Sequence, residues 1–322
     1  MTKARSVSDS TVVNFRNVLI NGGFSIDQRN AGASQTITAG AAIAYTVDRW
    51  YAYCTGANIT GARVAGAAPS RYYYRFTGAT SNTAVGFGQR IETDNSFHLA
   101  GREVTLSVNI ASTSLTSITW TAFRANTTDA FGSLASPTRT QIGTGTFAVT
   151  STLGTKTATF NVPSAATTGI EIVFTGGALL GSQTLTFDDV QLEVGSNATT
   201  FEQRPIGTEL DLCRRYYERY TNANNYYFPQ FPCNIDVANR AEVMIQYYPK
   251  RVAPVITSSG TITVESLTTT ANQATSNTVS TLVGTHLNSA NLFLSVTSWT
   301  ARDPAIFLLS GTGSWIEMTA EL

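Results

Sequence analysis

Two segments alternate aromatic side chains with arginines, a combination suited to stacking sugar rings and bonding their hydroxyls. In residues 48–54, the period of a β-strand places Trp50, Ala52 and Cys54 on one face, which we expect to be buried. Residues 71–76 alternate in the same way. The sequence therefore predicts an outward surface for a glycan or a protein partner, made of Arg49, Tyr51, Tyr53, Arg71, Tyr73 and Arg75.

A pair of adjacent carboxylates, Asp188 and Asp189, interrupts a strand pattern. Leu185 and Phe187 occupy odd positions, whereas the apolar residues after the pair occupy even positions, so a β-bulge is expected at residues 188–189. Two carboxylates at a bulge could bind a hard cation through oxygen ligands. Alternatively, their side chains bond local backbone N–H groups in a turn.

The sequence contains no pattern typical of a catalytic site. It has no nucleotide-binding glycine loop, no Cys/His metal spacing and no Gly-x-Ser-x-Gly elbow, and its two histidines leave little material for a general base. A glycosidase needs two paired carboxylates, and nothing in the sequence pairs them. We therefore expect a protein that is not an enzyme and has no cofactor. Cys54, Cys213 and Cys233 form no even framework and are expected to be reduced and buried.

Composition restricts the fold class and the partners of the 322-residue chain. Only 13% of residues are charged, 42% are hydrophobic, and Thr, Ser, Asn and Gly supply much of the rest, which favours an all-β protein. The 21 basic and 21 acidic residues cancel, so nucleic-acid binding is not expected. The first residues resemble no signal peptide and no window suits membrane insertion, which predicts synthesis in a cytoplasm without export by that route.

Four regions are expected along the chain. Residues 1–16 are polar and predict an N-terminal attachment arm, and residues 17–195 predict a jelly-roll β-sandwich. Residues 196–221 predict a linker and a short helix over 208–220, and residues 222–322 a second, smaller β-sandwich with a surface loop at 267–280. In the jelly roll, the expected strands are 18–28, 43–54, 71–77, 84–92, 102–111, 116–124, 145–150, 156–162, 169–175 and 184–194; in the second sandwich they are 225–237, 241–249, 253–264, 277–284, 291–298, 304–310 and 314–321.

The predicted helix carries an apolar stripe at a 3-4-3 spacing. The stripe consists of Leu210, Cys213, Tyr217 and Tyr220. It must pack either on a neighbouring subunit or on its own domain, because two heptads are too short to specify a coiled coil.

Two blocks of sequence carry a resemblance to a known class of proteins. Residues 17–30, Asn-Val-Leu-Ile-Asn-Gly-Gly-Phe-Ser-Ile-Asp-Gln-Arg-Asn, followed by Tyr-Thr-Val-Asp-Arg-Trp at 45–50, look like the opening of carbohydrate-binding-module-like jelly rolls in bacteriophage tail-fibre and related virion appendage proteins. Residues 187–196, 201–205 and 209–217 are similar to the end of that domain and its helical elbow. The final hundred residues resemble more weakly the small β tip domains that often follow.

The resemblance implies a structural protein on the outside of the virion, usually a homotrimer attached to other virion proteins through its N-terminal arm. It also implies a structural calcium ion at the closing Asp pair, Asp188 and Asp189, although Ser25 stands where such domains often carry an acidic residue. The function expected is a tail fibre that binds host-surface glycan. The alternative is a head fibre or capsid decoration protein, and a polysaccharide depolymerase is a third reading for which no long β-helix period is visible.

Overall fold

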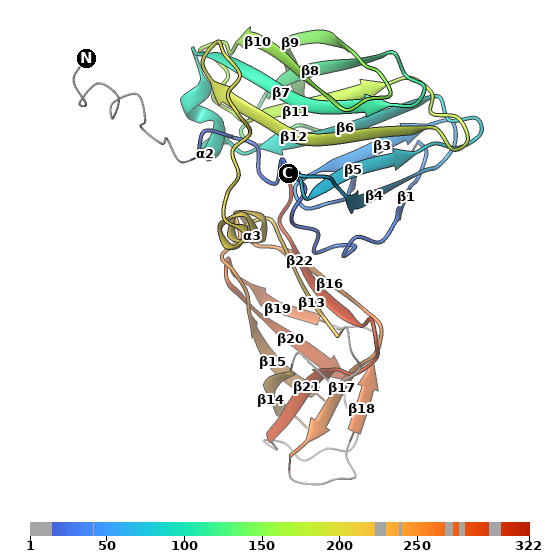
Figure 1. The fold of residues 1–322 in the computed structure, drawn as a ribbon. Coiled ribbons are helices and arrows are strands. Elements are labelled where there is room, and N and C mark those ends of the chain that lie inside the picture. Colours follow the sequence, from blue (N-terminus) through green and yellow to red (C-terminus); the bar gives the residue numbers. More distant parts are fainter. Residues whose placement is uncertain are drawn as a thin grey trace, which may run out of the picture. The chain divides into compact units, whose positions relative to one another are not determined.

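The computed structural model of the protein describes residues 15–40, 42–222, 230–237, 240–267, 273–276, 281–295 and 304–322. The chain divides into two compact units. Unit 1 comprises Met1–Glu209 together with Leu322, and unit 2 comprises Leu210–Glu321. Both units consist almost entirely of antiparallel β-strands (Figure 1), so the all-β fold class is confirmed.

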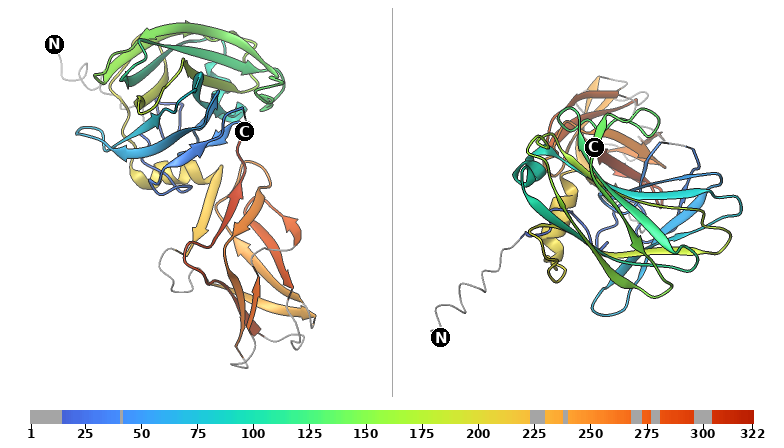
Figure 2. Two further views of the ribbon diagram at one scale, coloured as in Figure 1. Left: turned by 90° about the vertical axis from the view of Figure 1, so that its right-hand side faces the viewer. Right: turned by 90° about the horizontal axis from the view of Figure 1, so that it is seen from above.

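Unit 1 is a jelly-roll sandwich of two six-stranded sheets, which Figure 2 shows from two further sides. The first sheet contains, in spatial order, β1 (Gln35–Ile37), β4 (Ile59–Ala65), β5 (Tyr72–Thr77), β12 (Thr184–Val194), β7 (Glu103–Ser112) and β10 (Gly154–Asn161). The second sheet contains β2 (Ala44–Tyr45), β3 (Tyr51–Thr55), β6 (Ala84–Ile91), β11 (Ile170–Gly176), β8 (Ser117–Ala125) and β9 (Arg139–Ala148). Two short helical turns, α2 (Thr93–Ser96) and η1 (Phe97–Leu99), follow β6.

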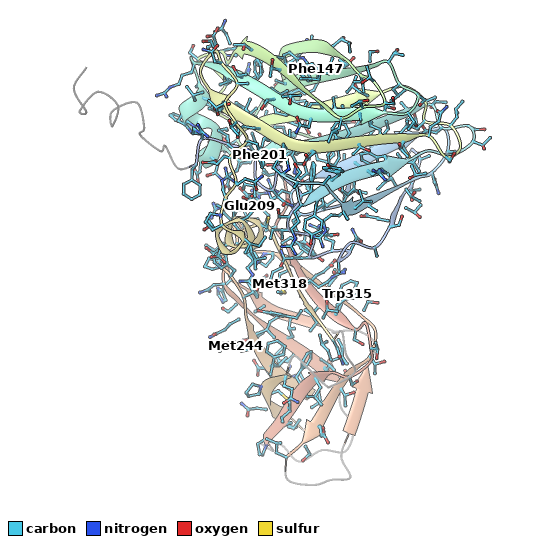
Figure 3. All side chains as sticks on the ribbon, in the orientation of Figure 1. Phe147, Phe201, Glu209, Met244, Trp315 and Met318 are labelled. Carbon is cyan, nitrogen blue, oxygen red and sulfur yellow. The ribbon has the colours of Figure 1, made fainter. Side chains whose placement is uncertain are left out.

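Aromatic side chains from both sheets fill the core of unit 1. Trp50 is 0% exposed, as its strand position predicts, and its ring stacks on Phe87 with centroids 4.8 Å apart. Phe87 also stacks on Tyr74 of the opposite sheet at 5.1 Å. Because such pairs add to the free energy gained by burying their area, this cluster joins the two sheets. Phe147 on β9 contributes to the same core and is labelled in Figure 3.

The opening segment was expected to form a strand over 18–28, and that prediction is wrong. The chain there runs through turns, with Asn21 and Phe24 at positive φ. Hydrogen bonds from side-chain amides take the place of strand pairing in this segment. Asn17 Nδ2 donates to the carbonyl of Val190 at 3.0 Å, and Asn21 Nδ2 donates to the carbonyls of Ile26 and Asp48. Apolar residues in this segment are buried by tertiary packing, so their presence does not require a strand.

The β-bulge predicted at Asp188–Asp189 is confirmed. The register of β12 against β7 shifts between Asp188 and Gln191, and Asp189 has a φ of 47°. The extra residue lets β12 bury Leu185 and Phe187 before the bulge and Val190 and Leu192 after it, whereas Val194 at the end of the strand is exposed.

Residues 196–205, expected to be a linker, lie against unit 1. Glu193 on β12 accepts hydrogen bonds from the backbone N–H and the hydroxyl of Thr199, each at 2.7 Å. The Glu202 N–H donates to Gln191 Oε1 at 2.9 Å. Glu202 in turn accepts the backbone N–H groups of Phe15, Arg16 and Asn17, so it holds the first described residues of the chain.

The helix that follows is shorter than predicted. It is α3 (Ile206–Arg214), with Glu209 at its centre (Figure 3). The prediction that it extends to residue 220 is wrong, because β13 (Tyr217–Thr221) begins three residues later and pairs with β22 (Trp315–Thr319). The aromatic residues that completed a helical stripe are therefore strand residues.

The four residues predicted for a subunit contact do not form one exposed stripe. Cys213 and Tyr217 have no exposed surface, and the hydroxyl of Tyr217 donates to Glu317 at 2.6 Å. Tyr220 packs on the core of unit 2 and donates its hydroxyl to the carbonyl of Gln246. Leu210 is half-buried on α3. Packing of Tyr217 and Tyr220 within their own domain is the alternative that the structure supports.

Unit 2 is a smaller sandwich of a three-stranded and a seven-stranded sheet, with Met318 of β22 in its core (Figure 3). Part of the stretch 267–280, expected to be a loop, forms β18, so that prediction is wrong for residues 273–276. The three-stranded sheet contains β13, β22 and β16 (Val255–Ser259); the other contains β18 (Gln273–Ser276), β17 (Ile262–Ser266), β21 (Pro304–Leu309), β14 (Gln230–Val237), β15 (Arg240–Gln246), β20 (Ser289–Ser295) and β19 (Thr281–Thr285).

Two further expectations concern cysteines and the chain start. All three cysteines are buried and free of disulfides, as predicted. The predicted attachment arm, residues 1–16, lies outside the described residues except for Phe15 and Arg16. Among the helices in the described ranges, none combines the length and apolar character needed to cross a bilayer.

Candidate functional site

The six residues predicted to form one outward surface belong to two different sheets of unit 1. Arg49, Tyr51 and Tyr53 lie at or on β3 of the second sheet, whereas Arg71, Tyr73 and Arg75 lie at or on β5 of the first sheet. The outer faces of a two-sheet sandwich point away from each other. The prediction of a single surface is therefore wrong, and the structure offers two separate candidate faces.

Arg49 and Tyr51 are buried, which corrects the expectation that they are exposed. Tyr51 does lie on the face of β3 away from Trp50, because its ring covers Gly88, where a Cβ atom would come within 2.8 Å of it. Its own exposed fraction is nevertheless 0%. Arg49 is 1% exposed at a φ of 72°, and its Nη2 donates to the carbonyl of Arg90. Strand alternation assigns a face but cannot show what covers it.

Glu171 on β11 organises this outer face of the second sheet. It is fully buried, and its carboxylate accepts the hydroxyl of Tyr51 at 2.7 Å and Nε of Arg90 at 2.8 Å. Its other oxygen pairs with Nη1 of Arg139 from the edge strand β9. Burial raises the pKa of Tyr51, so the tyrosine remains a hydrogen-bond donor to Glu171. A buried carboxylate with three donors is satisfied and rigid.

Three partly exposed side chains lie on the same outer face of the second sheet, and we call them the platform: Tyr53, Phe123 and Arg139, of which Arg139 also belongs to the network. The Tyr53 ring rests directly on Gly86, where a Cβ atom would approach the ring to 2.1 Å. The Arg139 guanidinium lies 4.3 Å from the centroid of the Phe123 ring. Burial raises the pKa of Tyr53, and the positive charge of Arg139 lowers it in part. The platform presents aromatic surface beside a cation.

Arg71, Tyr73 and Arg75 occupy the other face. Tyr73 and Arg75 line a groove of about 340 Å³ on the outer face of the first sheet, together with Thr184 and Thr186 of β12. Arg71 is exposed, with its guanidinium 5.2 Å from the Tyr72 ring centroid. The structure thus keeps Tyr73 and Arg75 together and leaves Arg71 outside the groove.

The two carboxylates of the bulge are buried and incompletely hydrogen-bonded, which is compatible with a bound cation. Both side-chain oxygens of Asp188 and Oδ1 of Asp189 are buried without a hydrogen bond of full geometry, although the backbone N–H of Asp189 and the side chains of Ser70 and Asn109 lie close enough to Asp188 to lower its pKa in part. Oδ2 of Asp189 accepts Ser70 Oγ at 3.2 Å and Asn109 Nδ2 at 3.3 Å. Burial raises the pKa of Asp188, and burial together with the charge of Asp188 raises the pKa of Asp189 to about 6.

Unsatisfied buried carboxylate oxygens cost free energy unless a proton or a cation neutralises them. Asp188 and Asp189 would hold a calcium ion, which takes six to eight oxygen ligands, the remainder coming from carbonyls, hydroxyls or water. Such an ion would neutralise the two carboxylates at the bulge. Across the part of the chain that the structure describes, no three His, Cys, Asp or Glu side chains are gathered so as to hold a metal ion.

Sequence reasoning did not identify Glu171, Arg90, Arg139 or Phe123. One signal was present, since Glu171 is a single acidic residue between Ile170 and Ile172 in an otherwise apolar strand. A lone carboxylate in such a strand must find buried partners. Its partners come from β3, β6 and β9, and no sequence pattern relates those strands.

Comparison with known proteins gives matches in structure alone. No protein-family model matches the sequence, and no curated protein matches it significantly. Similar solved structures include a CBM4 carbohydrate-binding module (20% identity, 54% of this chain, 98% of that chain, TM-score 0.34) and TmCBM61 in complex with β-1,4-galactotriose (14%, 56%, 99%, 0.34). Another is the enzymatically active domain of tailspike protein 4 of bacteriophage CBA120 (15%, 56% of this chain, 22% of that chain, 0.33). Similarity of this degree does not identify a ligand or an activity.

Proposed function

We propose that this chain is a structural protein on the outside of a bacteriophage particle, a tail fibre whose unit 1 binds neutral glycan of the host surface. The observation that carries the glycan-binding part is the platform. Tyr53 and Phe123 offer aromatic surface, and the buried carboxylate of Glu171 fixes Arg139 beside Phe123.

Neutral sugars are bound by aromatic faces that stack on the ring and by polar groups that bond the hydroxyls. Both kinds of group must already be in place, because ordering side chains on binding costs affinity. Tyr53 cannot sink toward the sheet, since its ring already touches the backbone at Gly86. Arg139 retains donors beyond the one that it gives to Glu171, because its guanidinium carries five N–H groups.

Placement on a virion is supported by the sequence resemblance, which covers the opening and the close of unit 1. In this proposal the residues before Phe15 attach the fibre to other virion proteins, and three chains assemble. The protein is made in the host cytoplasm and functions in the particle. Its role is binding, without catalysis or nucleic acid.

The binding proposal is tested with purified protein on a panel of immobilised neutral oligosaccharides. Tyr53→Ala and Phe123→Ala should each lower the affinity for the retained glycan by about tenfold or more, because each removes a stacking surface. Tyr53→Phe keeps the ring and should bind nearly as wild type. Thr157→Ala, on an exposed position of β10, is the control. Equal binding by wild type and both alanine variants, or no retained neutral glycan, would refute the proposal.

The location in the particle needs a separate experiment. Gold-labelled antibody against unit 2, imaged on intact particles, should mark the tail. Label on the capsid would instead assign the chain to a head fibre or decoration protein. Label on neither would reject the virion assignment while leaving the glycan measurement intact.

A further inference from the structure

The groove on the outer face of the first sheet has a different chemical character from the platform. It has a volume of about 340 Å³, and its walls come from β5, β12, the end of β7 and the segments that follow β7 and β9. Hydroxyl-bearing side chains make up much of the lining, among them Thr113, Ser151, Thr184 and Thr186, and Leu153 and Ala111 add apolar side chains. A cavity of this size lies at the small end of the range for small-molecule sites.

Arg75 supplies the charge of the groove. Of the described residues that line it, Arg75 alone is charged. Arg75 is exposed, and its Nε donates to Thr186 Oγ1 at 3.3 Å. It forms no ion pair with any residue that the structure describes. The hydroxyl of Thr186 therefore orients a guanidinium whose terminal nitrogens remain able to bind an anion.

Tyr73 adds a fixed aromatic wall. Its hydroxyl accepts the backbone N–H of Ala67 at 3.0 Å, which anchors the far end of the side chain. The ring is half-buried and lines the groove two residues before Arg75, on the same face of β5. The acids next along β12, Asp188 and Asp189, do not line the groove, and Asp188 is 1% exposed.

We propose that this groove is a second saccharide site, which binds a sugar that carries a carboxylate. Arg75 pairs with the carboxylate, Tyr73 contacts the sugar ring, and the threonine and serine hydroxyls bond the ring hydroxyls. Planar two-point pairing between guanidinium and carboxylate favours arginine at such a position. The site is independent of the platform, because the two lie on the outer faces of opposite sheets.

The test uses full-length protein and a panel of oligosaccharides containing uronic or sialic acids, each beside its carboxyl-reduced counterpart. At least one carboxylated glycan should be retained about tenfold more strongly than its reduced form. Raising the salt concentration should weaken that binding, since an exposed ion pair is screened. Arg75→Gln should remove the preference for the carboxylate, and Tyr73→Ala should weaken both forms.

Two variants separate this proposal from the proposed function. Tyr53→Ala should leave carboxylated binding unchanged while it reduces neutral binding at the platform. Arg75 is exposed, so Arg75→Gln should retain the wild-type unfolding midpoint, and an unchanged midpoint confirms that the variant is folded. The proposal is overturned if no carboxylated glycan exceeds its reduced counterpart, or if Arg75→Gln retains the preference.

Discussion

Glu171 and Tyr51 show how a side chain on the outer face of a sheet becomes essential to the fold. The Tyr51 hydroxyl is one of three donors to a carboxylate with no exposure to water. Tyr51→Phe should therefore destabilise unit 1 by about 1–3 kcal/mol, and Glu171→Gln by about 3–5 kcal/mol because it leaves two arginines without a buried counter-charge. Urea unfolding followed by tryptophan fluorescence measures both. If Glu171→Gln were as stable as wild type, the network would not have the stabilising role assigned to it.

Trp50 makes a matched comparison, since it directly precedes Tyr51 and β3 and its side chain lies in the core between the sheets. Its ring contacts Phe24 and Phe87, with centroids 5.6 and 4.8 Å away. Trp50→Ala should cost about 3–5 kcal/mol through lost burial and the cavity left behind. The same urea titration checks the value, with fluorescence from the three remaining tryptophans, and Thr157→Ala should not move the midpoint.

Asp188 and Asp189 predict a response of stability to both calcium and pH. Calcium should raise the unfolding midpoint of wild type and leave that of Asp188→Asn nearly unchanged. A calcium concentration of a hundred times the dissociation constant should raise the free energy of unfolding by about 2.7 kcal/mol. Magnesium is the control, because it requires a tighter octahedral site. Equal midpoints in calcium and in chelator, measured by differential scanning calorimetry, would remove the cation assignment.

The sign of the pH effect follows from the direction of the pKa shift. Asp189 has its pKa raised to about 6 by burial and by Asp188, from 3.8 in the unfolded chain. In chelator the folded state therefore binds more protons than the unfolded state, and stability should fall as pH rises through this interval. With calcium the trend should reverse, because the ion requires the deprotonated carboxylates. Calorimetric midpoints across the interval, with and without chelator, distinguish the two cases.

At the scale of elements, Glu202 ties the beginning of the described chain to the segment after β12. Burial alone would raise its pKa, but the backbone N–H groups of Asn17, Arg16 and Phe15, together with the charge of Arg204, lower it below 4.5. Its stabilisation is therefore complete above the unfolded pKa and is lost as pH falls through the folded value. Glu202→Gln should reduce the stability of the protein at neutral pH and make its stability less dependent on pH in the acid range. The unfolding midpoint measured across the acid range checks this, and the same pH dependence in Glu202→Gln as in wild type would contradict the prediction.

The boundaries of elements also decide how truncations must be designed. Because Tyr217–Thr221 is β13 and pairs with β22, a chain ended after Tyr220 would carry four of the five residues of a unit 2 strand without the strand that pairs with it. A cut directly after Arg214, at the end of α3, avoids this. Similarly, an N-terminal deletion must stop before Phe15 to preserve the bonds to Glu202.

At the scale of the whole molecule, we expect a trimer that attaches through its N-terminal residues. Light scattering on the purified protein should give about three times 34.5 kDa over a range of concentrations. A stable monomer at micromolar concentration would contradict the assembly. Deleting residues 1–14 should leave the same oligomer in solution and prevent its incorporation into particles. Normal incorporation would refute attachment by this end.

Local patterns in the sequence determined the fold class, the bulge and the burial of Trp50. Low charge and abundant β-branched polar residues predicted an all-β fold, and the phase slip around Asp188 predicted the bulge. Alternation placed Trp50 in the core. These properties follow from the period of a strand, which is encoded by neighbours in the chain.

Tertiary structure alone decided which residues share a surface. Strand order brought Glu171 beside Tyr51 and Arg139, and it separated Tyr53 from Tyr73 onto opposite sheets. The helical spacing from Leu210 to Tyr220 matched a stripe, yet pairing with β22 made its second half a strand. Burial on the outer face of a sheet, the groove beside Arg75 and the unpaired oxygens of Asp188 all depend on contacts between residues distant in sequence. Periodicity cannot encode such contacts, because it specifies the direction of a side chain and not what lies opposite it.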